Sequence, residues 1–374
     1  MKIVIVSAFD TYEQRVLLLR DFFLDNGYEV VVFSSDFHHM EKSRRIERPE
    51  HFELIRTMPY RRNISFQRLY SHRDFARKIL KKLNTEKADL VWMLFPPNSL
   101  VNISAKYKRK NKNAKIVLDA IDMWPEAMPI TNPAIAKALK PWKLVRSKYL
   151  NEADLIVTEC ERYQEILCDE CDQEKMINIY LAQTEEMISS TPKTPDDRFE
   201  LCYLGSVNSI IDIDKIAEIL QNLPKKKKNP LLHIIGSGEK IDDFIKTAEE
   251  AGAEVSFHGK VYDIKEKQNV FDRCHFGINV MKDEVYVGLT MKSMDYFRGG
   301  LPLINNIKGD TERLVSEYNM GINYKGPESL DDETIIKAQE NRGNIQSVYM
   351  EMFTREAFYK KTREAVDRLT IGGQ

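Results

Sequence analysis

Apolar residues recur along the chain with two spacings, one typical of strands and one typical of helices. The short apolar run 2–7 predicts a buried strand, and the amphipathic stretch 12–26 predicts a helix that ends at Gly27. Further runs predict strands in the first half at 29–33, 51–56, 89–94, 115–118, 154–158 and 176–180. Helical stretches separate most of them, which favours a parallel α/β architecture.

The second half of the chain repeats this alternation. Its apolar runs predict strands at 200–204, 231–235, 254–257 and 276–280. The helical pattern predicts helices at 212–221, 240–251 and 263–271, and a long last helix at 344–369. The alternation therefore restarts as a second α/β unit rather than extending the first.

The stretch 183–198 between the two halves is polar and contains prolines, which is typical of a linker. We expect an N-terminal Rossmann-like domain over 1–182, a second one over 199–345, and a C-terminal helix over 346–374. The predicted fold class is α/β, with two doubly wound domains. A cleft between two such domains is the natural ligand site.

Composition limits the class of protein. The 374 residues suffice for two domains, and 43% hydrophobic and 30% charged residues are ordinary for a soluble globular protein. No apolar run reaches 18 residues, so we expect no membrane span. The five cysteines are scattered, which suits a reducing cytoplasm. Cys168 and Cys171 form a lone C-x-x-C with no second Cys or His pair nearby, and the histidines show no ligand spacing, so we expect no metal. No nucleic-acid reading motif is present, so we expect no nucleic-acid partner.

Positive charge gathers in 60–115, which holds fifteen Lys or Arg and three acidic residues. Within this stretch, apolar residues from Phe66 to Leu83 interleave with basic residues from Arg68 to Lys82. A basic amphipathic helix of this kind can lie on an anionic membrane surface, each basic residue adding about 1 kcal/mol. A solvated helix whose apolar stripe packs on the sheet fits the same pattern.

The segment 287–304 reads as a loop, a short helix, a tight turn and a buried strand. Thr290 suits a helix N-cap, and Lys292 and Asp295 share one helical face because they are three residues apart. A lysine at a helix N-terminus can hold phosphate, and a carboxylate one turn later can bond sugar hydroxyls. Together they suit a nucleotide-sugar. A surface Lys–Asp pair on a helix that caps a core strand is the alternative.

Three shorter motifs carry candidate chemistry. Gly236-Ser237-Gly238 follows a predicted strand, and it suits either a phosphate-cradling loop or a tight strand-to-helix turn. Asp122 follows the predicted strand 115–118, at the sheet edge where ligands bind, but it also suits a turn that Trp124 anchors. The Asp212-Ile213-Asp214 pair opens a predicted helix, so we assign it to capping rather than to a metal.

The segment around Lys292 resembles the donor-binding stretch of GT-B type retaining glycosyltransferases, of the family 4 kind that builds bacterial polysaccharides. That stretch has a lysine, a Glu three residues later, an aromatic residue, and Gly-x-Pro. Its counterparts here are Lys292, Asp295, Tyr296, Gly300 and Pro302. Asp295 stands in place of the family's Glu, and the family's first Glu has no counterpart, Glu284 being nearest. Other stretches also match the family: 27–32, 122–126, 203–206, 234–238 and 353–358.

This resemblance implies roles for individual residues. It assigns Lys292 to the diphosphate of the donor, Asp295 to the ribose, Val261 to the base and Asp122 to the transferred sugar. It also implies that the C-terminal helix crosses back onto the first domain. Further residues that it places in the donor site are Gly205, Gly236, Gly288, Leu289 and Thr290.

The resemblance further implies a cytoplasmic, metal-independent, retaining enzyme that uses a nucleotide-sugar, above all a UDP-sugar, and needs no cofactor. Its acceptor would be a lipid-linked saccharide in capsule, exopolysaccharide or O-antigen synthesis, reached from the inner membrane face. One alternative is a nucleotide-sugar epimerase on the same fold, which the few histidines and carboxylates disfavour. Another is a non-catalytic assembly partner, which the missing first Glu leaves open.

Overall fold

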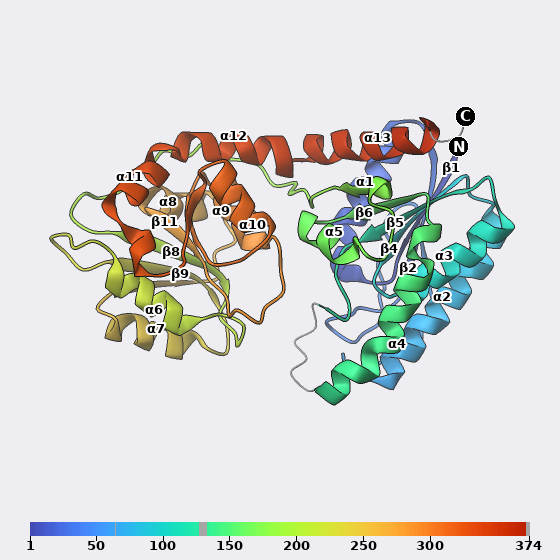
Figure 1. The fold of residues 1–374 in the computed structure, drawn as a ribbon, viewed down its shortest axis with the longest axis horizontal. Helices are drawn as coiled ribbons and strands as arrows, with labels where there is room; N and C mark the ends of the chain where they lie inside the picture. The colour runs from blue at the N-terminus through green and yellow to red at the C-terminus, as the bar shows by residue number, and fades with distance from the viewer. Residues whose placement is uncertain (64, 127–132, 372–374) are drawn as a thin grey trace. The chain divides into compact units, whose positions relative to one another are not determined.

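The computed structural model of the protein describes residues 1–63, 65–126 and 133–371. The chain divides into two compact units (Figure 1). Unit 1 consists of Met1–Ala182 together with Arg355–Gln374, and unit 2 of Gln183–Thr354. Each unit has its own parallel sheet, so the expected fold class of two Rossmann-like α/β units is confirmed. Residues 372–374 of the predicted C-terminal segment lie outside the described residues.

Unit 1 contains a seven-stranded sheet in the order β3-β2-β1-β4-β5-β6-β7. Its strands are β1 (Lys2–Ser7), β2 (Glu29–Ser35), β3 (Phe52–Ile55), β4 (Leu90–Phe95), β5 (Lys115–Ala120), β6 (Leu155–Thr158) and β7 (Met176–Asn178). Its helices are α1 (Glu13–Asp25), α2 (Phe66–Glu86), α3 (Ser99–Lys110), α4 (Pro133–Tyr149), α5 (Glu161–Leu167) and α13 (Arg355–Ile371). The strand order reverses between β1 and β4, which makes their carboxyl ends the expected ligand edge.

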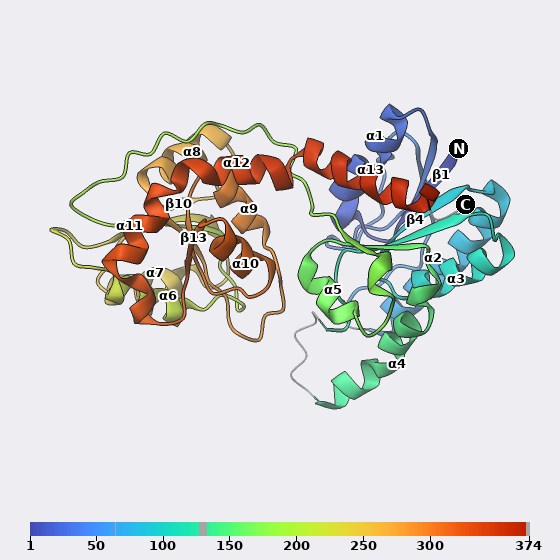
Figure 2. The same ribbon diagram turned by 45° about the horizontal axis from the view of Figure 1, so that its top comes forward.

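The continuous apolar run of β1 follows from burial on both faces of the sheet. Val4 and Val6 pack in one cluster with apolar residues of α2 and α3, whereas Ile3 and Ile5 pack in another with α1 and α13. Successive strand residues point to opposite faces, so both sets must be apolar when helices cover both sides. Helix α13 therefore completes the core of unit 1 beside α1, as Figure 2 shows.

The predicted basic helix is α2, and most of its apolar stripe packs in the core of unit 1. Phe75, Ile79 and Leu83 are buried in the core of unit 1. The apolar stripe therefore packs on the sheet over this part of the helix, which is the alternative that the sequence left open. Phe66, at the beginning of the helix, is 91% exposed. The most exposed basic residues of α2 are Arg73, Arg77 and Lys81, whereas Lys78 and Lys82 form ion pairs with Asp74 and Glu53.

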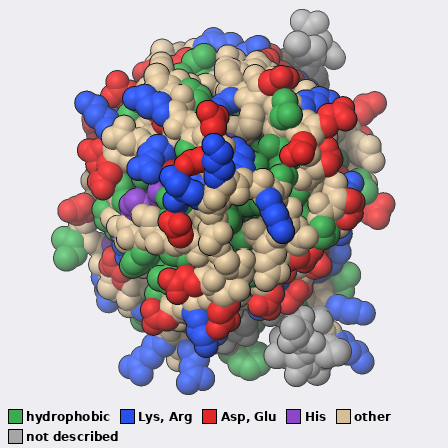
Figure 3. All heavy atoms as spheres, turned by 90° about the vertical axis from the view of Figure 1, so that its left-hand side faces the viewer, with side chains coloured by type: hydrophobic (Ala, Val, Ile, Leu, Met, Phe, Trp, Pro, Cys, Tyr) green, Lys and Arg blue, Asp and Glu red, His purple; other side chains and the backbone are tan. Residues whose placement is uncertain are grey.

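Unit 2 contains a six-stranded parallel sheet in the order β10-β9-β8-β11-β12-β13. Its strands are β8 (Glu200–Ser206), β9 (Leu231–Ser237), β10 (Glu254–Gly259), β11 (Phe276–Asn279), β12 (Leu303–Asn305) and β13 (Gly321–Asn323). Its helices are α6 (Ile213–Asn222), α7 (Ile241–Glu250), α8 (Ile264–Arg273), α9 (Met291–Arg298), α10 (Asp310–Glu317), α11 (Asp332–Glu340) and α12 (Arg342–Phe353). The face of unit 2 turned to the viewer in Figure 3 carries acidic and basic side chains intermixed.

The predicted last helix differs from the structure. It is two helices, α12 in unit 2 and α13 in unit 1, separated by Thr354. The backbone of Thr354 is extended, with φ −88° and ψ 166°, so the helical hydrogen bonds stop there. Within the part of the chain that the structure describes, no helix is both long and apolar enough to cross a membrane.

Candidate functional site

The sheet of unit 2 reverses its strand order between β8 and β11, and three of the predicted donor residues lie in or beside β8 and its neighbour β9. Open parallel sheets bind ligands outside the carboxyl ends of their strands at such a point. Gly205, near the end of β8, pairs with Gly236 of β9. The ammonium nitrogen of Lys292 lies 4.7 Å from the ring centroid of Tyr203, also in β8. Lys292, Gly205 and Gly236 are thus brought to one sheet edge.

Lys292 presents a buried ammonium group with no anion beside it. Its Nζ is shielded from solvent and makes no hydrogen bond to any described residue. Burial lowers the pKa of Lys292 to about 8. Burying an unpaired charge is costly, so an anionic ligand at this position would relieve a penalty that the folded protein already carries. Lys292 is also the second residue of α9, where the helix dipole favours a phosphate.

Asp295, one turn later, belongs to a hydrogen-bond network within unit 2. Its Oδ1 accepts hydrogen bonds from Arg298 Nη2 and from Gln183 Nε2, both at 3.0 Å. Gln183 in turn accepts one from the Tyr349 hydroxyl at 3.0 Å. Burial raises the pKa of Asp295. Its Oδ2 accepts no hydrogen bond from the described residues, so this is the oxygen that a sugar hydroxyl could reach.

Thr290 is the N-cap of α9, which confirms that prediction. Its Oγ1 accepts a hydrogen bond from the Ser293 backbone N–H at 3.1 Å and donates one to Asn279 Oδ1 at 3.1 Å. The side-chain amide of Asn279 also donates to Ser293 Oγ at 3.0 Å. These hydrogen bonds therefore hold the start of α9 against the end of β11, which fixes the position of Lys292.

Asn279 also begins a ladder of asparagines that the sequence reasoning missed. Its Nδ2 donates to Asn305 Oδ1 at 2.8 Å, and Asn305 Nδ2 donates to Asn323 Oδ1 at 2.9 Å. These are the last residues of β11, β12 and β13, three neighbouring strands. The sequence does contain a signal, because an Ile-Asn pair ends each of these short apolar runs.

The glycines near β9 serve close backbone packing. A Cβ at Gly236 would lie 1.9 Å from the Gly205 carbonyl oxygen, and one at Gly238 would lie 2.0 Å from that of Val207. The tight turn, one of the two readings of this motif, therefore accounts for both glycines. Gly205 differs, since it has a φ of +115° and a Cβ there would meet nothing within 4 Å. Its backbone is thus open to close approach by a ligand.

The other predicted donor residues lie in loops of unit 2. The Gly288 carbonyl accepts hydrogen bonds from the Thr311 backbone N–H at 2.9 Å and hydroxyl at 2.8 Å, which fixes the loop before α9. Leu289 follows it and is half-buried. Val261, also half-buried, comes just after β10, the strand paired with β9.

Asp122 lies in unit 1, just after β5. Its Oδ1 accepts a hydrogen bond from the Met123 backbone N–H at 2.8 Å, and its Oδ2 accepts one from the Tyr12 hydroxyl at 3.3 Å. Burial raises the pKa of Asp122. Trp124 is half-buried against Phe9, with ring centroids 5.5 Å apart. These contacts fit the turn that the sequence offered as an alternative, and the sugar-side role of Asp122 stays a prediction.

The Asp212-Ile213-Asp214 pair has the capping role that the sequence indicated. Asp212 Oδ1 accepts a hydrogen bond from the Lys215 backbone N–H at 3.0 Å, at the start of α6. Across residues 1–63, 65–126 and 133–371, no three or more His, Cys, Asp or Glu side chains are grouped to hold a metal ion.

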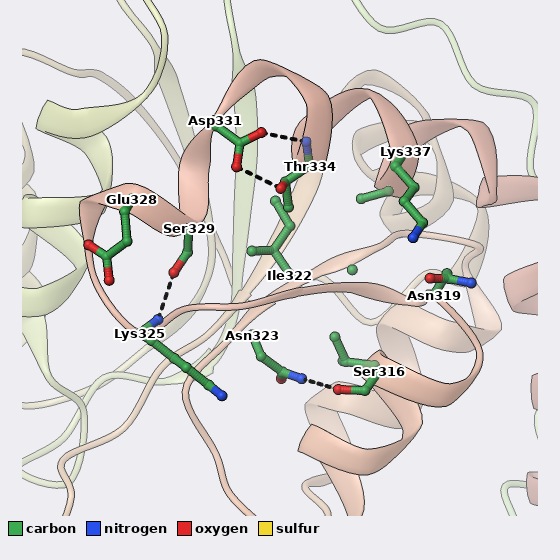
Figure 4. A pocket seen from close by; sticks show the side chains of 13 residues that line it. Ser316, Asn319, Ile322, Asn323, Lys325, Glu328, Ser329, Asp331, Thr334 and Lys337 are labelled. Atoms are coloured by element: carbon green, nitrogen blue, oxygen red, sulfur yellow. Dashed lines mark hydrogen bonds between the residues drawn. The ribbon is translucent and has the colours of Figure 1, made fainter.

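A pocket of about 440 Å³ beside β13 contains none of the predicted site residues (Figure 4). Asp331, on its rim, caps α11 by accepting hydrogen bonds from the Thr334 backbone N–H at 2.9 Å and hydroxyl at 2.7 Å. Asn323, at the end of the asparagine ladder, donates to Ser316 Oγ at 2.9 Å. These polar groups of the pocket thus stabilise the local structure, and we assign the pocket no ligand.

Comparisons with known proteins address the fold. No protein-family model matches the chain. The chain is 24% identical over 178 residues to the chitobiosyldiphosphodolichol beta-mannosyltransferase of Yarrowia lipolytica, a match that spans 47% of this chain and only 36% of that protein. Among solved structures, the lipopolysaccharide outer core galactosyltransferase WaaB superposes with a TM-score of 0.70 at 14% identity, over 98% of this chain and 99% of WaaB. The chain has the GT-B fold.

Two further GT-B structures agree over the whole chain. Sucrose-phosphate synthase from Thermosynechococcus elongatus gives a TM-score of 0.69 at 13% identity, with both chains fully covered. Anabaena HepE, solved in complex with UDP and glucose, gives 0.63 at 13% identity, over 98% of this chain and 99% of HepE. In this GT-B chain the motif residue Tyr296 is fully buried, and its hydroxyl donates a hydrogen bond to the Cys202 carbonyl at 3.0 Å. At such identities the likeness establishes the fold alone, because one fold can serve many functions.

Proposed function

We propose that this GT-B protein is a glycosyltransferase that moves a sugar from a nucleotide-sugar donor to a saccharide acceptor. The observation that carries the proposal is the buried, unpaired ammonium of Lys292 at the start of α9, near the open backbone of Gly205. Such a group suits a diphosphate at the carboxyl edge of a parallel sheet. The complex of HepE with UDP and glucose supports a uridine donor.

In the proposed site, positive groups of the protein stabilise the negative charge of the leaving diphosphate. Lys292 Nζ would bind the diphosphate and gain most as negative charge builds up on it in the transition state. Asp295 Oδ2 would accept a hydrogen bond from a ribose hydroxyl, and Val261 would contact the base. No metal is required for these contacts, because a lysine and a helix N-terminus already supply positive charge.

We further propose that the enzyme retains the configuration of the transferred sugar. The acceptor oxygen would form its bond to the anomeric carbon on the face from which the diphosphate departs, and the acceptor proton would pass to the departing phosphate oxygen. Asp122 would contact the transferred sugar. A lipid-linked saccharide of capsule, exopolysaccharide or O-antigen synthesis is the proposed acceptor, and the inner face of the cytoplasmic membrane the proposed place of action.

Binding of a nucleoside diphosphate tests this function. A ligand at about 100 times its dissociation constant adds roughly 2.7 kcal/mol of stability. For domains of this size that corresponds to roughly 2–4 °C per kcal/mol in melting temperature. We expect UDP to raise the melting temperature more than GDP, ADP or dTDP in a thermal-shift panel. Absence of a shift with all four would count heavily against a transferase.

Turnover separates the proposed function from its alternatives. A transferase releases UDP from a UDP-sugar faster when an acceptor is added. An epimerase inverts the sugar at C2, and an assembly partner does neither. The absent first Glu of the family motif is the feature that favours the last of these.

Docking on an anionic membrane is a separate proposal for the beginning of α2. Phe66 is exposed there, and Arg73, Arg77 and Lys81 are exposed further along the same helix. We expect co-sedimentation with anionic vesicles at low salt and release as salt rises, since charges are screened over about 10 Å at 0.1 M. Replacing the three basic residues with glutamine should abolish it, whereas replacing lysines 225–227 of unit 2 should not. Equal binding to neutral vesicles would contradict the proposal.

A further inference from the structure

A group of aromatic side chains surrounds Arg68 at the carboxyl edge of the unit 1 sheet. The guanidinium carbon lies 4.0 Å from the ring centroid of Trp124, 5.5 Å from that of Phe9 and 5.8 Å from that of Tyr60. Phe9 follows β1 and Trp124 follows β5, so these rings come from the strand ends where ligands bind in such sheets. Rings cover the faces of the guanidinium, and only its edges remain for hydrogen bonds.

One edge of the Arg68 guanidinium has no hydrogen-bond partner among the described residues. Arg68 Nη1 donates to the Asn63 carbonyl at 2.7 Å, whereas Nε and Nη2 are buried and have no hydrogen-bond partner among the described residues. Nε and Nη2 together form the fork that binds a carboxylate or phosphate through two parallel hydrogen bonds. The Arg68 residue as a whole is only 4% exposed, so bulk solvent has little access to the fork.

Two other buried arginines of unit 1 show what normally fills this fork. Arg15 donates from Nε and Nη2 to the two oxygens of Asp119, at 2.9 and 3.0 Å. Arg146 donates from the same two nitrogens to the oxygens of Glu170, at 2.9 and 2.7 Å. In the described part of unit 1 the fork of Arg68 lacks the carboxylate that both of these arginines have.

The surroundings of Arg68 offer a second donor and no strong counter-ion. His72, one turn further along α2 on the same face, is buried and has neither ring nitrogen bonded to a described residue. Burial lowers the pKa of Arg68, and the neighbouring Tyr60, Tyr12 and Asp122 oppose this lowering only in part. The carboxylate of Asp122 already accepts hydrogen bonds from Met123 and Tyr12, and burial raises its pKa.

We propose that the Nε–Nη2 fork of Arg68 binds an oxyanion, a phosphate or a carboxylate, carried by the saccharide acceptor. This inference rests on the proposed transferase function and narrows its acceptor to an anionic saccharide. The half-buried side chain of Trp124 would pack against the sugar ring that bears the anion. A neutral saccharide would leave the fork unpaired and would bind more weakly.

Melting temperatures of the full chain test the oxyanion site. Glucose 6-phosphate, glucuronate and glucose are added separately at constant ionic strength to protein that carries Lys292→Ala, so that the donor site does not respond. We expect one or both anions to raise the melting temperature and glucose to leave it unchanged. The size of the shift with glucose 6-phosphate, compared with that with glucuronate, shows which oxyanion the fork prefers. The shift should vanish in Arg68→Met and weaken in Arg68→Lys, because lysine keeps the charge but has no fork.

Arg15→Met is the matched control, since its fork is already filled by Asp119. It should melt well below the parent protein yet keep the anion shift. Arg68→Met should melt no lower than the parent without anion, because an unpaired buried charge is replaced by an apolar side chain. The proposal would be overturned if neither anion shifted the melting temperature, or if Arg68→Met kept the full shift. It would also be overturned if Arg68→Met without anion melted as low as Arg15→Met. The UDP shift is measured on Arg68→Met with Lys292 intact, so a failure of the transferase function is seen separately.

Discussion

Replacing Asp119 with alanine is expected to lower the free energy of unfolding of unit 1 by about 3–5 kcal/mol. Asp119 is fully buried and accepts hydrogen bonds from Arg15 Nε at 2.9 Å, Arg15 Nη2 at 3.0 Å and Trp92 Nε1 at 2.8 Å. Its loss removes the carboxylate that is hydrogen-bonded to the buried guanidinium of Arg15, which costs more than the pair itself contributes. Urea unfolding followed by circular dichroism measures the change.

An exposed ion pair of the same unit provides the control. Lys361 and Glu364 pair on the solvent side of α13 at 2.9 Å, with half-exposed side chains. Glu364→Ala should change the free energy of unfolding by less than about 1 kcal/mol, because water screens such pairs. If Asp119→Ala cost no more than Glu364→Ala, burial would not be what makes the Arg15–Asp119 pair matter.

Lys292→Ala is expected to weaken UDP binding by about 1.5–3 kcal/mol, roughly 10- to 150-fold. The mutation removes the charge that the proposed donor site directs at the diphosphate, while the hydrogen bonds that cap α9 through Thr290 remain. Isothermal titration calorimetry measures the dissociation constant, and the melting temperature without ligand shows whether the fold is intact. Wild-type affinity in the variant would remove Lys292 from the site.

The pH dependence of binding gives a sharper test of the same residue. Burial lowers the pKa of Lys292 from its ordinary 10.5 to about 8. Between these values the unfolded chain keeps the proton that the folded protein loses, so stability rises with pH over this window. UDP affinity should fall over the same window, by up to about tenfold between pH 8 and 9. Lys292→Arg stays charged and should show no such fall, and identical profiles for the two proteins would contradict this role.

The features that the sequence predicted correctly are local or periodic. The helical period placed Lys292 and Asp295 on one face, and the residue type of Thr290 predicted its capping role, because both depend on neighbours within one turn. The alternation of apolar runs predicted two parallel α/β units, since a strand covered on both faces must be apolar throughout. Local and periodic patterns were thus sufficient to predict the fold.

The features that the sequence did not predict depend on distant parts of the chain. Asp295 accepts a hydrogen bond from Gln183, 112 residues earlier, and no local pattern links the two. The asparagine ladder needs the order of β11, β12 and β13 in the sheet, which spacing alone does not provide. The open fork of Arg68 likewise becomes visible only when the aromatic rings from other segments are placed around it.

The return of the chain to unit 1 has a consequence for the order of folding during synthesis. Most of unit 1 precedes unit 2 in the chain, but its core includes Phe358, Ala365 and Leu369 of α13, which leave the ribosome only after unit 2. Unit 2 is already complete by Thr354. Unit 1 therefore cannot complete its core before unit 2 has been made, and until then the apolar face that α13 covers is exposed to water and to other nascent chains.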